Sequence, residues 1–265
     1  MRGGRTIMGT GRLDGKFALV TGGSRGIGRA IARRLAADGA TVVLTYARDA
    51  ESAAGIVAQI EKEGGRAHAI QADFGTHGDA ERLWAAYDEA TRDEPGGGGR
   101  VDIIVNNAGI GRSDDLEHLT EDGFDEVFAV NVRAPLFIVQ QALPRLNDGG
   151  RIVNVTTGLT RIAMPEILAY SATKAALENL TLNLAVQLGP RGVTVNSVRP
   201  GIIDTDVNAS WLRGNPEAWE QSAALSALGR VGEPEDVADV VSFLASDEAR
   251  WVTGSALDAT GGSKL

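Results

Sequence analysis

The chain has 265 residues, of which 43% are hydrophobic and 23% are charged, and its formal net charge is −9. This length and composition favour one large soluble domain with a substantial core. The negative charge argues against binding to nucleic acid or to an anionic membrane surface. The absence of cysteine excludes disulfides, thiolate catalysis and zinc–thiolate sites.

The N-terminal segment, residues 1–12, is rich in Gly, Arg and Thr. It lacks the apolar stretch of a secretory signal, so we expect a flexible tail in front of a single domain that spans residues 13–265. No run of about 18 apolar residues occurs, and no transmembrane helix is therefore expected. Together these features favour a cytoplasmic protein.

Hydrophobic patterning predicts strands and helices in alternation along the chain. Short β-branched and apolar runs predict strands, and apolar residues three and four positions apart predict helices. Strands are expected at 16–20, 41–45, 66–71, 101–106, 151–156 and 193–198, and helices at 26–37, 51–63, 79–91, 122–146 (interrupted near Pro135) and 170–188. An alternation of this kind favours an α/β fold, a doubly wound parallel sheet with helices on both faces.

The alternation breaks between residues 204 and 229. This stretch contains Trp211 and Trp219 and is expected to be a helical insertion over the sheet. The two tryptophans are expected either to line a substrate lid or to pack the insertion onto the body of the domain. Beyond it, the acidic residues around Pro234 predict a helix start, because Pro suits the first turn and acids suit the positive end of the helix dipole.

Three glycines, Gly22, Gly26 and Gly28, lie between the first predicted strand and the first predicted helix. A dinucleotide needs close approach of the backbone to its pyrophosphate, which glycine permits. The helix N-terminus adds free N–H groups and a partial positive charge. The loop therefore indicates a dinucleotide site in a Rossmann-type domain, although a tight glycine turn without a ligand remains the alternative.

Further motifs follow the glycine loop in a fixed order. They are Asn106-Asn107-Ala108-Gly109, Asn131, Tyr170-Ser-Ala-Thr-Lys174, and Pro200-Gly201 followed by Thr205. With the loop from Thr21 to Gly28, they make the chain resemble the short-chain dehydrogenase/reductase superfamily over about residues 14–262. Within that superfamily the chain is similar to 3-oxoacyl-carrier-protein reductases and to bacterial polyketide ketoreductases. The resemblance implies a single Rossmann-type domain and a homo-oligomer, a dimer or a tetramer, with Glu178 and Asn179 facing a partner subunit.

The resemblance also implies a role for each matching residue. Tyr170 matches the general acid/base, Lys174 the lysine that binds the nicotinamide ribose and lowers the pKa of the tyrosine, and Asn131 the asparagine that holds a proton-relay water. The spacing of Tyr170 and Lys174 places them on one face of a helix. The residues expected to bind the cofactor, besides Tyr170 and Lys174, are Gly22, Ser24, Arg25, Gly26, Ile27, Gly28, Arg48, Asp73, Phe74, Asn107, Ala108, Gly109, Pro200, Gly201, Ile203 and Thr205.

One position departs from the pattern of the family. Thirteen residues before Tyr170 the family usually has a serine, and this chain has Thr157. A threonine hydroxyl has the same donor and acceptor capacity, so we expect Thr157 to orient the substrate carbonyl and stabilise developing negative charge. The rival hypothesis is a protein that binds the cofactor without turnover.

The end of the second predicted strand favours NADP(H) over NAD. NAD selection usually needs an acidic residue there, and Thr45, Tyr46 and Ala47 are not acidic. Instead Arg25 and Arg48 are placed to bind a 2′-phosphate, unless both are merely solvated surface charges. NADPH in turn favours the reductive direction.

The expected substrate is a small-molecule ketone, reduced to a secondary alcohol. Substrate contacts are expected from residues 110–116, 159–168 and 207–225, which are rich in Leu, Ile, Met and Trp and favour an apolar ketone, including polyketide-like or acyl substrates. Two alternatives stay open, an NAD-dependent alcohol dehydrogenase that works oxidatively and a non-catalytic regulatory protein that binds the cofactor. No metal site is expected, because the three histidines are scattered along the chain.

Overall fold

A seven-stranded sheet, in the order β3-β2-β1-β4-β5-β6-β7, runs through the computed structural model, which describes residues 11–112 and 115–264. Every neighbouring pair of strands is parallel. The strands are β1 (Phe17–Val20), β2 (Thr41–Tyr46), β3 (Arg66–Gln71), β4 (Val101–Asn106), β5 (Leu146–Val155), β6 (Thr194–Pro200) and β7 (Ala256–Ala259). The predicted doubly wound parallel sheet is confirmed.

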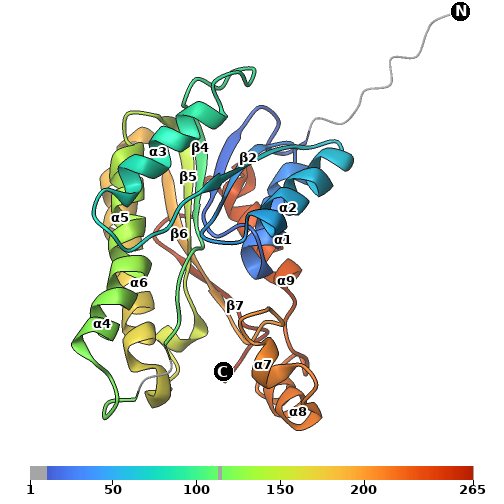
Figure 1. Ribbon diagram of the computed structural model, residues 1–265, viewed down its shortest axis with the longest axis vertical. Helices are drawn as coiled ribbons and strands as arrows, with labels where there is room; N and C mark the ends of the chain where they lie inside the picture. Colours follow the sequence, from blue (N-terminus) through green and yellow to red (C-terminus); the bar gives the residue numbers. More distant parts are fainter. Residues whose placement is uncertain (1–10, 113–114, 265) are drawn as a thin grey trace, which may run out of the picture.

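Two layers of helices cover the sheet, one on each face (Figure 1). The layers are α1 (Gly26–Ala37), α2 (Ala50–Lys62) and α9 (Pro234–Ala245) on one face, and α3 (Asp79–Ala90), α4 (Glu121–Phe128), α5 (Ala134–Ala142) and α6 (Leu168–Leu188) on the other. Alternate strand residues enter two separate cores, since Val42 and Leu44 join the α1 side while Val43 joins the α3 side. Burial of both faces is why these strands are almost continuously apolar.

The long helix expected at 122–146 is three elements in the structure. A π-helical turn, Ala129–Arg133, separates α4 from α5, and Pro135 lies in the first turn of α5. The break therefore precedes the proline by several residues. Residues 143–145 of the expected helix form a turn, and its last residue, Leu146, begins β5, whose pairing with β4 passes through a register shift.

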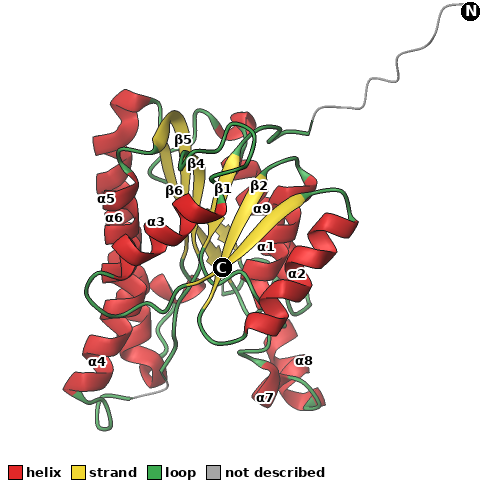
Figure 2. Cartoon of the chain, turned by 45° about the horizontal axis from the view of Figure 1, so that its top comes forward, coloured by secondary structure: helices red, strands yellow, loops and turns green. Residues whose placement is uncertain are grey.

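The insertion after β6 contains two short helices, α7 (Ala209–Leu212) and α8 (Pro216–Ala224). Next, α9 begins at Pro234 with a capping box formed by Glu233 and Asp236, as the acidic start signal predicted. Both α4 and the α7–α8 pair lie at one end of the molecule, on opposite sides of it (Figures 1 and 2).

The first residues that the structure describes pack onto the domain. Gly11 and Arg12 belong to a turn, and Arg12 forms an ion pair with Glu248 at 3.0 Å. Residues 1–10 of the expected tail lie outside the described residues. Among the helices of the described chain, none is both long and apolar enough to span a bilayer.

The sheet topology brings the predicted motifs to one edge. Strands β1, β4, β5 and β6 end next to the glycine loop, the Asn107 turn, Thr157 and Gly201, respectively. Because all the strands are parallel, these four carboxyl ends meet on the same side of the sheet, which is where α/β folds bind ligands.

Candidate active site

The glycine loop needs its glycines for two different steric reasons. Gly26 has φ +53°, a left-handed conformation that other residues rarely adopt. Gly28 has ordinary dihedral angles, but a Cβ at this position would collide with the carbonyl oxygen of Gly22. The loop therefore folds back closely on the start of α1 and leaves backbone rather than side chains facing the space above it.

The glycine loop is tied to the turn that follows β4. Asn107 Nδ2 donates hydrogen bonds to the carbonyl oxygens of Thr21 (2.9 Å) and Gly22 (3.0 Å). In the other direction, Thr21 Oγ1 accepts from the backbone N–H groups of Asn107 (3.0 Å) and Ala108 (2.9 Å). These four bonds hold the two predicted cofactor segments at a fixed separation, which a rigid dinucleotide site requires.

The N-terminus of α1 suits a phosphate group. Arg25 is the N-cap residue of α1, and no side chain of the described residues caps the helix there. Its first N–H groups are thus left for a ligand, and the helix dipole adds partial positive charge. Thr205 closes this side of the loop, since its Cβ and Cγ2 lie only 3.4 Å from where a Cβ on Gly26 would be.

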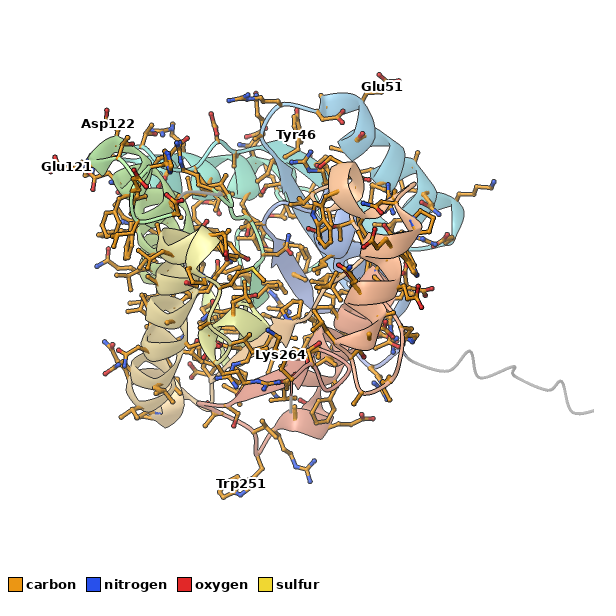
Figure 3. The ribbon with its side chains drawn as sticks, turned by 90° about the horizontal axis from the view of Figure 1, so that it is seen from below. Tyr46, Glu51, Glu121, Asp122, Trp251 and Lys264 are labelled. Carbon is orange, nitrogen blue, oxygen red and sulfur yellow. The ribbon has the colours of Figure 1, made fainter. Side chains whose placement is uncertain are left out.

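Arg25 and the β2–α2 loop that carries Arg48 lie near one another. The guanidinium of Arg25 contributes to the lowered pKa of Asp49, although hydrogen bonds from Ser52 are the larger cause. Asp49 itself is committed to capping α2, with Ser52 N–H at 2.9 Å and Ser52 Oγ at 2.6 Å. Tyr46 ends β2 on the same side of the molecule as the first turn of α2 (Figure 3), and Arg48 follows it by two residues.

The remaining predicted cofactor residues follow β3 and β6. Asp73 is exposed and Phe74 is half-buried against the α3-side core, both just beyond β3. Pro200 and Ile203 are buried, and Ile203 pairs with Gly232 in an isolated parallel bridge. The structure therefore brings the loop after β6 against the glycine loop, whereas the two residues after β3 lie beyond β2 toward the sheet edge.

Tyr170 lies in the first turn of α6, and its hydroxyl lies close enough to the side chain of Thr157 for that side chain to influence its pKa. Burial raises the pKa of Tyr170 to about 12, and Thr157 offsets part of that rise. The phenol therefore stays protonated at neutral pH. Such a group can donate a proton but cannot act as a base before another charge stabilises its anion.

Lys174 follows one turn later and is almost fully buried. Its Nζ donates a hydrogen bond to the carbonyl oxygen of Val155 at 2.9 Å and lies 5.8 Å from the centroid of the Tyr170 ring. Burial lowers the pKa of Lys174 to about 8. The expected lowering of the pKa of Tyr170 by this lysine stays a prediction, since burial is the largest cause of the shift in the protein alone.

Asn131 is fully buried in the π-helical turn and connects two parts of the site. Its Oδ1 accepts from the N–H of Ile110, and its Nδ2 donates to the Ile110 carbonyl, both at 2.9 Å. Nδ2 also donates to Thr173 Oγ1 at 3.1 Å. A Cβ on Gly109 would lie 3.1 Å from Asn131 Oδ1 and 3.3 Å from Lys174 Nζ. The turn after β4 therefore packs closely against Asn131 and against Lys174 of α6. The water-holding role of Asn131 stays a prediction.

A polar cluster that the sequence did not predict lies beside Thr157. The carboxylate of Glu178 accepts hydrogen bonds from the side chains of Thr156, Thr160 and Arg199 within the subunit. The signal that pointed to the cluster was periodicity, because Tyr170, Lys174 and Glu178 are spaced by four residues. The expected contact of Glu178 with a partner subunit stays a prediction. Asn179 is exposed.

The segments expected to contact substrate expose large apolar side chains. Residues 113 and 114 of the first segment lie outside the described residues. The exposed apolar residues in or beside the three segments are Leu116, Met164, Leu168, Val207, Trp211, Trp219, Leu225 and Leu228. Trp211 and Trp219 are each about two-fifths exposed, and neither is packed away inside the domain. Within residues 11–112 and 115–264, no cluster of three or more His, Asp or Glu side chains is arranged to hold a metal ion.

Comparison with known proteins identifies the family. Residues 22–264 match the family model described as enoyl-(acyl carrier protein) reductase. Versicolorin reductase stcU of Emericella nidulans is 41% identical over 262 residues, which cover 95% of this chain and 97% of that protein. The structure of LugOII, a promiscuous reductase described as catalysing keto-reduction at C1 in lugdunomycin biosynthesis, aligns with a TM-score of 0.91 and 50% identity over 95% of this chain and 98% of the other.

A second solved structure carries ligands. The landomycin C-6 ketoreductase LanV with bound NADP and rabelomycin aligns with a TM-score of 0.87 and 46% identity, over 95% of this chain and 97% of the other. Such identity over nearly the full length accounts for the order of motifs, the seven-stranded parallel sheet and the Tyr170–Lys174 helix together. The chain belongs to the short-chain dehydrogenase/reductase superfamily.

Proposed function

We propose that the protein reduces a ketone to a secondary alcohol with NADPH as the reductant, and that Tyr170 is the general acid. The observation that carries this proposal is the grouping of the Thr157 and Tyr170 side chains at the carboxyl edge of the sheet, with Lys174 Nζ 5.8 Å from the centroid of the Tyr170 ring. When bound, NADPH supplies the hydride that adds to the carbonyl carbon. The residues of the chain hold the carbonyl oxygen and deliver one proton to it.

Thr157 and Tyr170 place two hydroxyl groups side by side. Together they can donate hydrogen bonds to one carbonyl oxygen and stabilise the negative charge that develops on it. The raised pKa keeps Tyr170 protonated at neutral pH, so its O–H transfers a proton to that oxygen. Lys174, which is charged below about pH 8, binds the cofactor ribose and stabilises the tyrosinate left behind.

The chain's own residues fit NADP(H). The start of α1 has no side-chain cap and accepts the pyrophosphate beside Gly26 and Gly28. Arg25 and Arg48 border the end of β2, where the 2′-phosphate of the adenosine ribose would lie, and no acidic residue occupies positions 45–47. NADP bound in a relative that is 46% identical agrees with this assignment.

The substrate class that we propose is an apolar, fused-ring aromatic ketone of the polyketide type. The three segments expected to line the substrate site expose Met, Leu and Trp side chains. Two relatives point the same way, since one structure holds rabelomycin and another relative is named a versicolorin reductase.

The test mixes the protein with NADPH and a ketone panel, and follows the loss of NADPH absorbance. The panel contains fused-ring aromatic ketones, aliphatic ketones and a 3-oxoacyl thioester. We expect ketone-dependent oxidation that is fastest with the fused-ring compounds. Thr157→Ser should keep kcat within about threefold because the hydroxyl remains, whereas Thr157→Ala should lower kcat about 100-fold. NADPH binding without turnover on any ketone, or an undiminished kcat in Thr157→Ala, would contradict the proposal.

We also propose that the protein works in the cytoplasm as a homo-oligomer, a tetramer. Support comes from apolar side chains exposed on the outer surface of α4, α5 and α6, which are Phe124, Phe137, Leu143, Leu182 and Val186. Trp251, which is 97% exposed, projects outward near the edge strand β7 (Figure 3). Light scattering should give about four times the 27.7 kDa chain mass, and cell fractionation should place the protein in the cytoplasmic fraction; a monomeric mass or a membrane fraction would contradict this assignment.

A further inference from the structure

The segment that carries Thr157 leaves the sheet at the end of β5 and turns at once. Thr157 itself is extended, with φ −164° and ψ 152°, and a 3₁₀ turn, Gly158–Thr160, follows it. The Thr157 carbonyl accepts from the backbone N–H of Thr160 at 3.3 Å and from Thr160 Oγ1 at 3.1 Å. The position of the Thr157 hydroxyl therefore depends on where Thr156 and Thr160, its neighbours on either side, are held.

Both of these neighbours are bound by one carboxylate. Glu178 Oε1 lies 3.0 Å from Thr156 Oγ1 and 3.0 Å from Thr160 Oγ1. Each hydroxyl has a single proton, and each also lies near a backbone carbonyl, that of Val198 for Thr156 and that of Thr157 for Thr160. A carboxylate is a stronger acceptor than a backbone carbonyl because the hydrogen bond is charge-assisted. Glu178 therefore binds the segment on both sides of Thr157.

Arg199 on β6 fixes the carboxylate from the opposite direction. Its Nε donates to Glu178 Oε1 at 2.8 Å and its Nη2 to Glu178 Oε2 at 2.6 Å, a bidentate pair. The Glu178 side chain is only 15% exposed and that of Arg199 24%. A two-point ion pair of this kind restricts the rotation of the glutamate side chain.

The same helix carries Glu178 and the proposed general acid. Tyr170, Lys174 and Glu178 follow one another at intervals of four residues along α6, so they share the helix face toward the ends of β5 and β6. One element thus positions the phenol directly and, through Glu178, the segment that carries Thr157.

We propose that Glu178 is a positioning residue for Thr157, which holds the threonine hydroxyl against Tyr170 by clasping Thr156 and Thr160. The inference rests on the proposed role of Thr157 in ketone reduction. Glu178 acts through its neighbours and does not touch the reacting atoms. Its loss should therefore slow the chemical step more than it weakens the binding of NADPH.

The informative variant is Glu178→Gln. Glutamine retains the length of the side chain but replaces one acceptor oxygen by a donor NH₂ group. That NH₂ group faces either the Arg199 guanidinium or the two threonine hydroxyls. Both of these are donors in the wild type, so at least one set of hydrogen bonds is lost. We expect kcat to fall about tenfold, because displacement of a reacting group by a fraction of an ångström has effects of that size. The Kd for NADPH, followed by fluorescence, should stay within about twofold of wild type.

A double-mutant cycle separates positioning from a merely structural role. If Glu178 acts through Thr157, Glu178→Gln should lower kcat in the wild type but cause no further loss in Thr157→Ala. Thr160→Val removes one bond to the carboxylate while it leaves the ion pair with Arg199, and it should lower kcat severalfold. If Glu178→Gln lowers Tm strongly, the double-mutant cycle with Thr157→Ala is made with Thr160→Val instead.

The matched control is Asp88→Asn. Asp88 pairs with Arg145 at 2.8 Å near the opposite edge of the sheet, and this variant should keep kcat within about twofold. Equal losses from Glu178→Gln in both backgrounds would overturn the inference and leave the proposed function standing. An undiminished kcat in Thr157→Ala would instead contradict the role of Thr157 itself, and the inference would fall with it.

Discussion

At Tyr170, the proposed general acid, the side chain is a neutral phenol at neutral pH. Burial outweighs the influence of Thr157 and raises the pKa of Tyr170 to about 12. The sequence predicted the residue, its spacing from Lys174 and the threonine in place of serine, because these depend on neighbours along the chain. It did not predict the direction of the pKa shift, because desolvation comes from segments that are distant in sequence.

Lys174 gives a pH dependence with a definite sign. Burial lowers its pKa to about 8, so the ammonium that is expected to bind the cofactor ribose is lost as the pH rises through that value. The Kd for NADPH, measured by fluorescence at about pH 7 and about pH 9.5, should therefore increase severalfold at the higher pH. In Lys174→Met the two values should coincide; equal Kd values at both pH values in the wild type would refute the assignment.

Arg25 and Arg48 should decide the choice between NADPH and NADH. Replacement of both by alanine removes two charge-assisted bonds to the 2′-phosphate and should raise the Kd for NADPH about 100-fold. The Kd for NADH, which lacks that phosphate, should change by less than about threefold. Arg29→Ala, an exposed arginine one turn into α1, is the control, and a parallel loss of both cofactors in the double variant would disprove the selective role.

At the scale of elements, the strongest signals were those with local causes. The helix start at Pro234 was predicted because a capping box and an N-terminal proline act within one turn. The π-helical turn Ala129–Arg133 was not predicted, because the residues around Asn131 continue the apolar pattern of a helix. In the structure Asn131 forms hydrogen bonds with Ile110 and Thr173, which are distant in the sequence. The short strand β7 was also missed, since its residues are half-exposed and do not alternate.

The turn between β1 and α1 leaves no room for a side chain at Gly28. In Gly28→Ala the added methyl group meets the Gly22 carbonyl oxygen, so the loop must shift. We expect a loss of about 1–3 kcal/mol in the free energy of unfolding and at least a tenfold weaker Kd for NADPH.

Gly55 offers the matched control for this substitution. It lies in α2, is exposed, and has open space where a Cβ would be. Gly55→Ala should stabilise the protein by about 0.5–1 kcal/mol through helix propensity and leave NADPH binding unchanged. Denaturant unfolding and NADPH titration of both variants measure these effects, and a normal NADPH affinity in Gly28→Ala would contradict the steric account.

For the molecule as a whole, the parallel sheet turns separate motifs into one site. The glycine loop, the Asn107 turn, Thr157 and Gly201 are far apart in the chain and meet because four parallel strands end at one edge. The alternation of strands and helices predicted the doubly wound fold, and the order of these motifs predicted the family. The hydrogen bonds from Thr156 and Thr160 to Glu178 were not predicted. They join α6 to the segment after β5, and the ion pair with Arg199 joins α6 to β6. These residues are distant in the sequence and meet only in the folded chain.

If the protein reduces a ketone with Tyr170 as the proton donor, Tyr170→Phe should abolish almost all turnover. The variant removes only the hydroxyl group, and ketone-dependent loss of NADPH is measured for it and for the wild type with the best ketone of the panel. We expect kcat to fall about 1,000-fold, within the range for loss of a general acid, while the Kd for NADPH stays unchanged. Turnover of Tyr170→Phe at the wild-type rate would show that Tyr170 is not the proton donor.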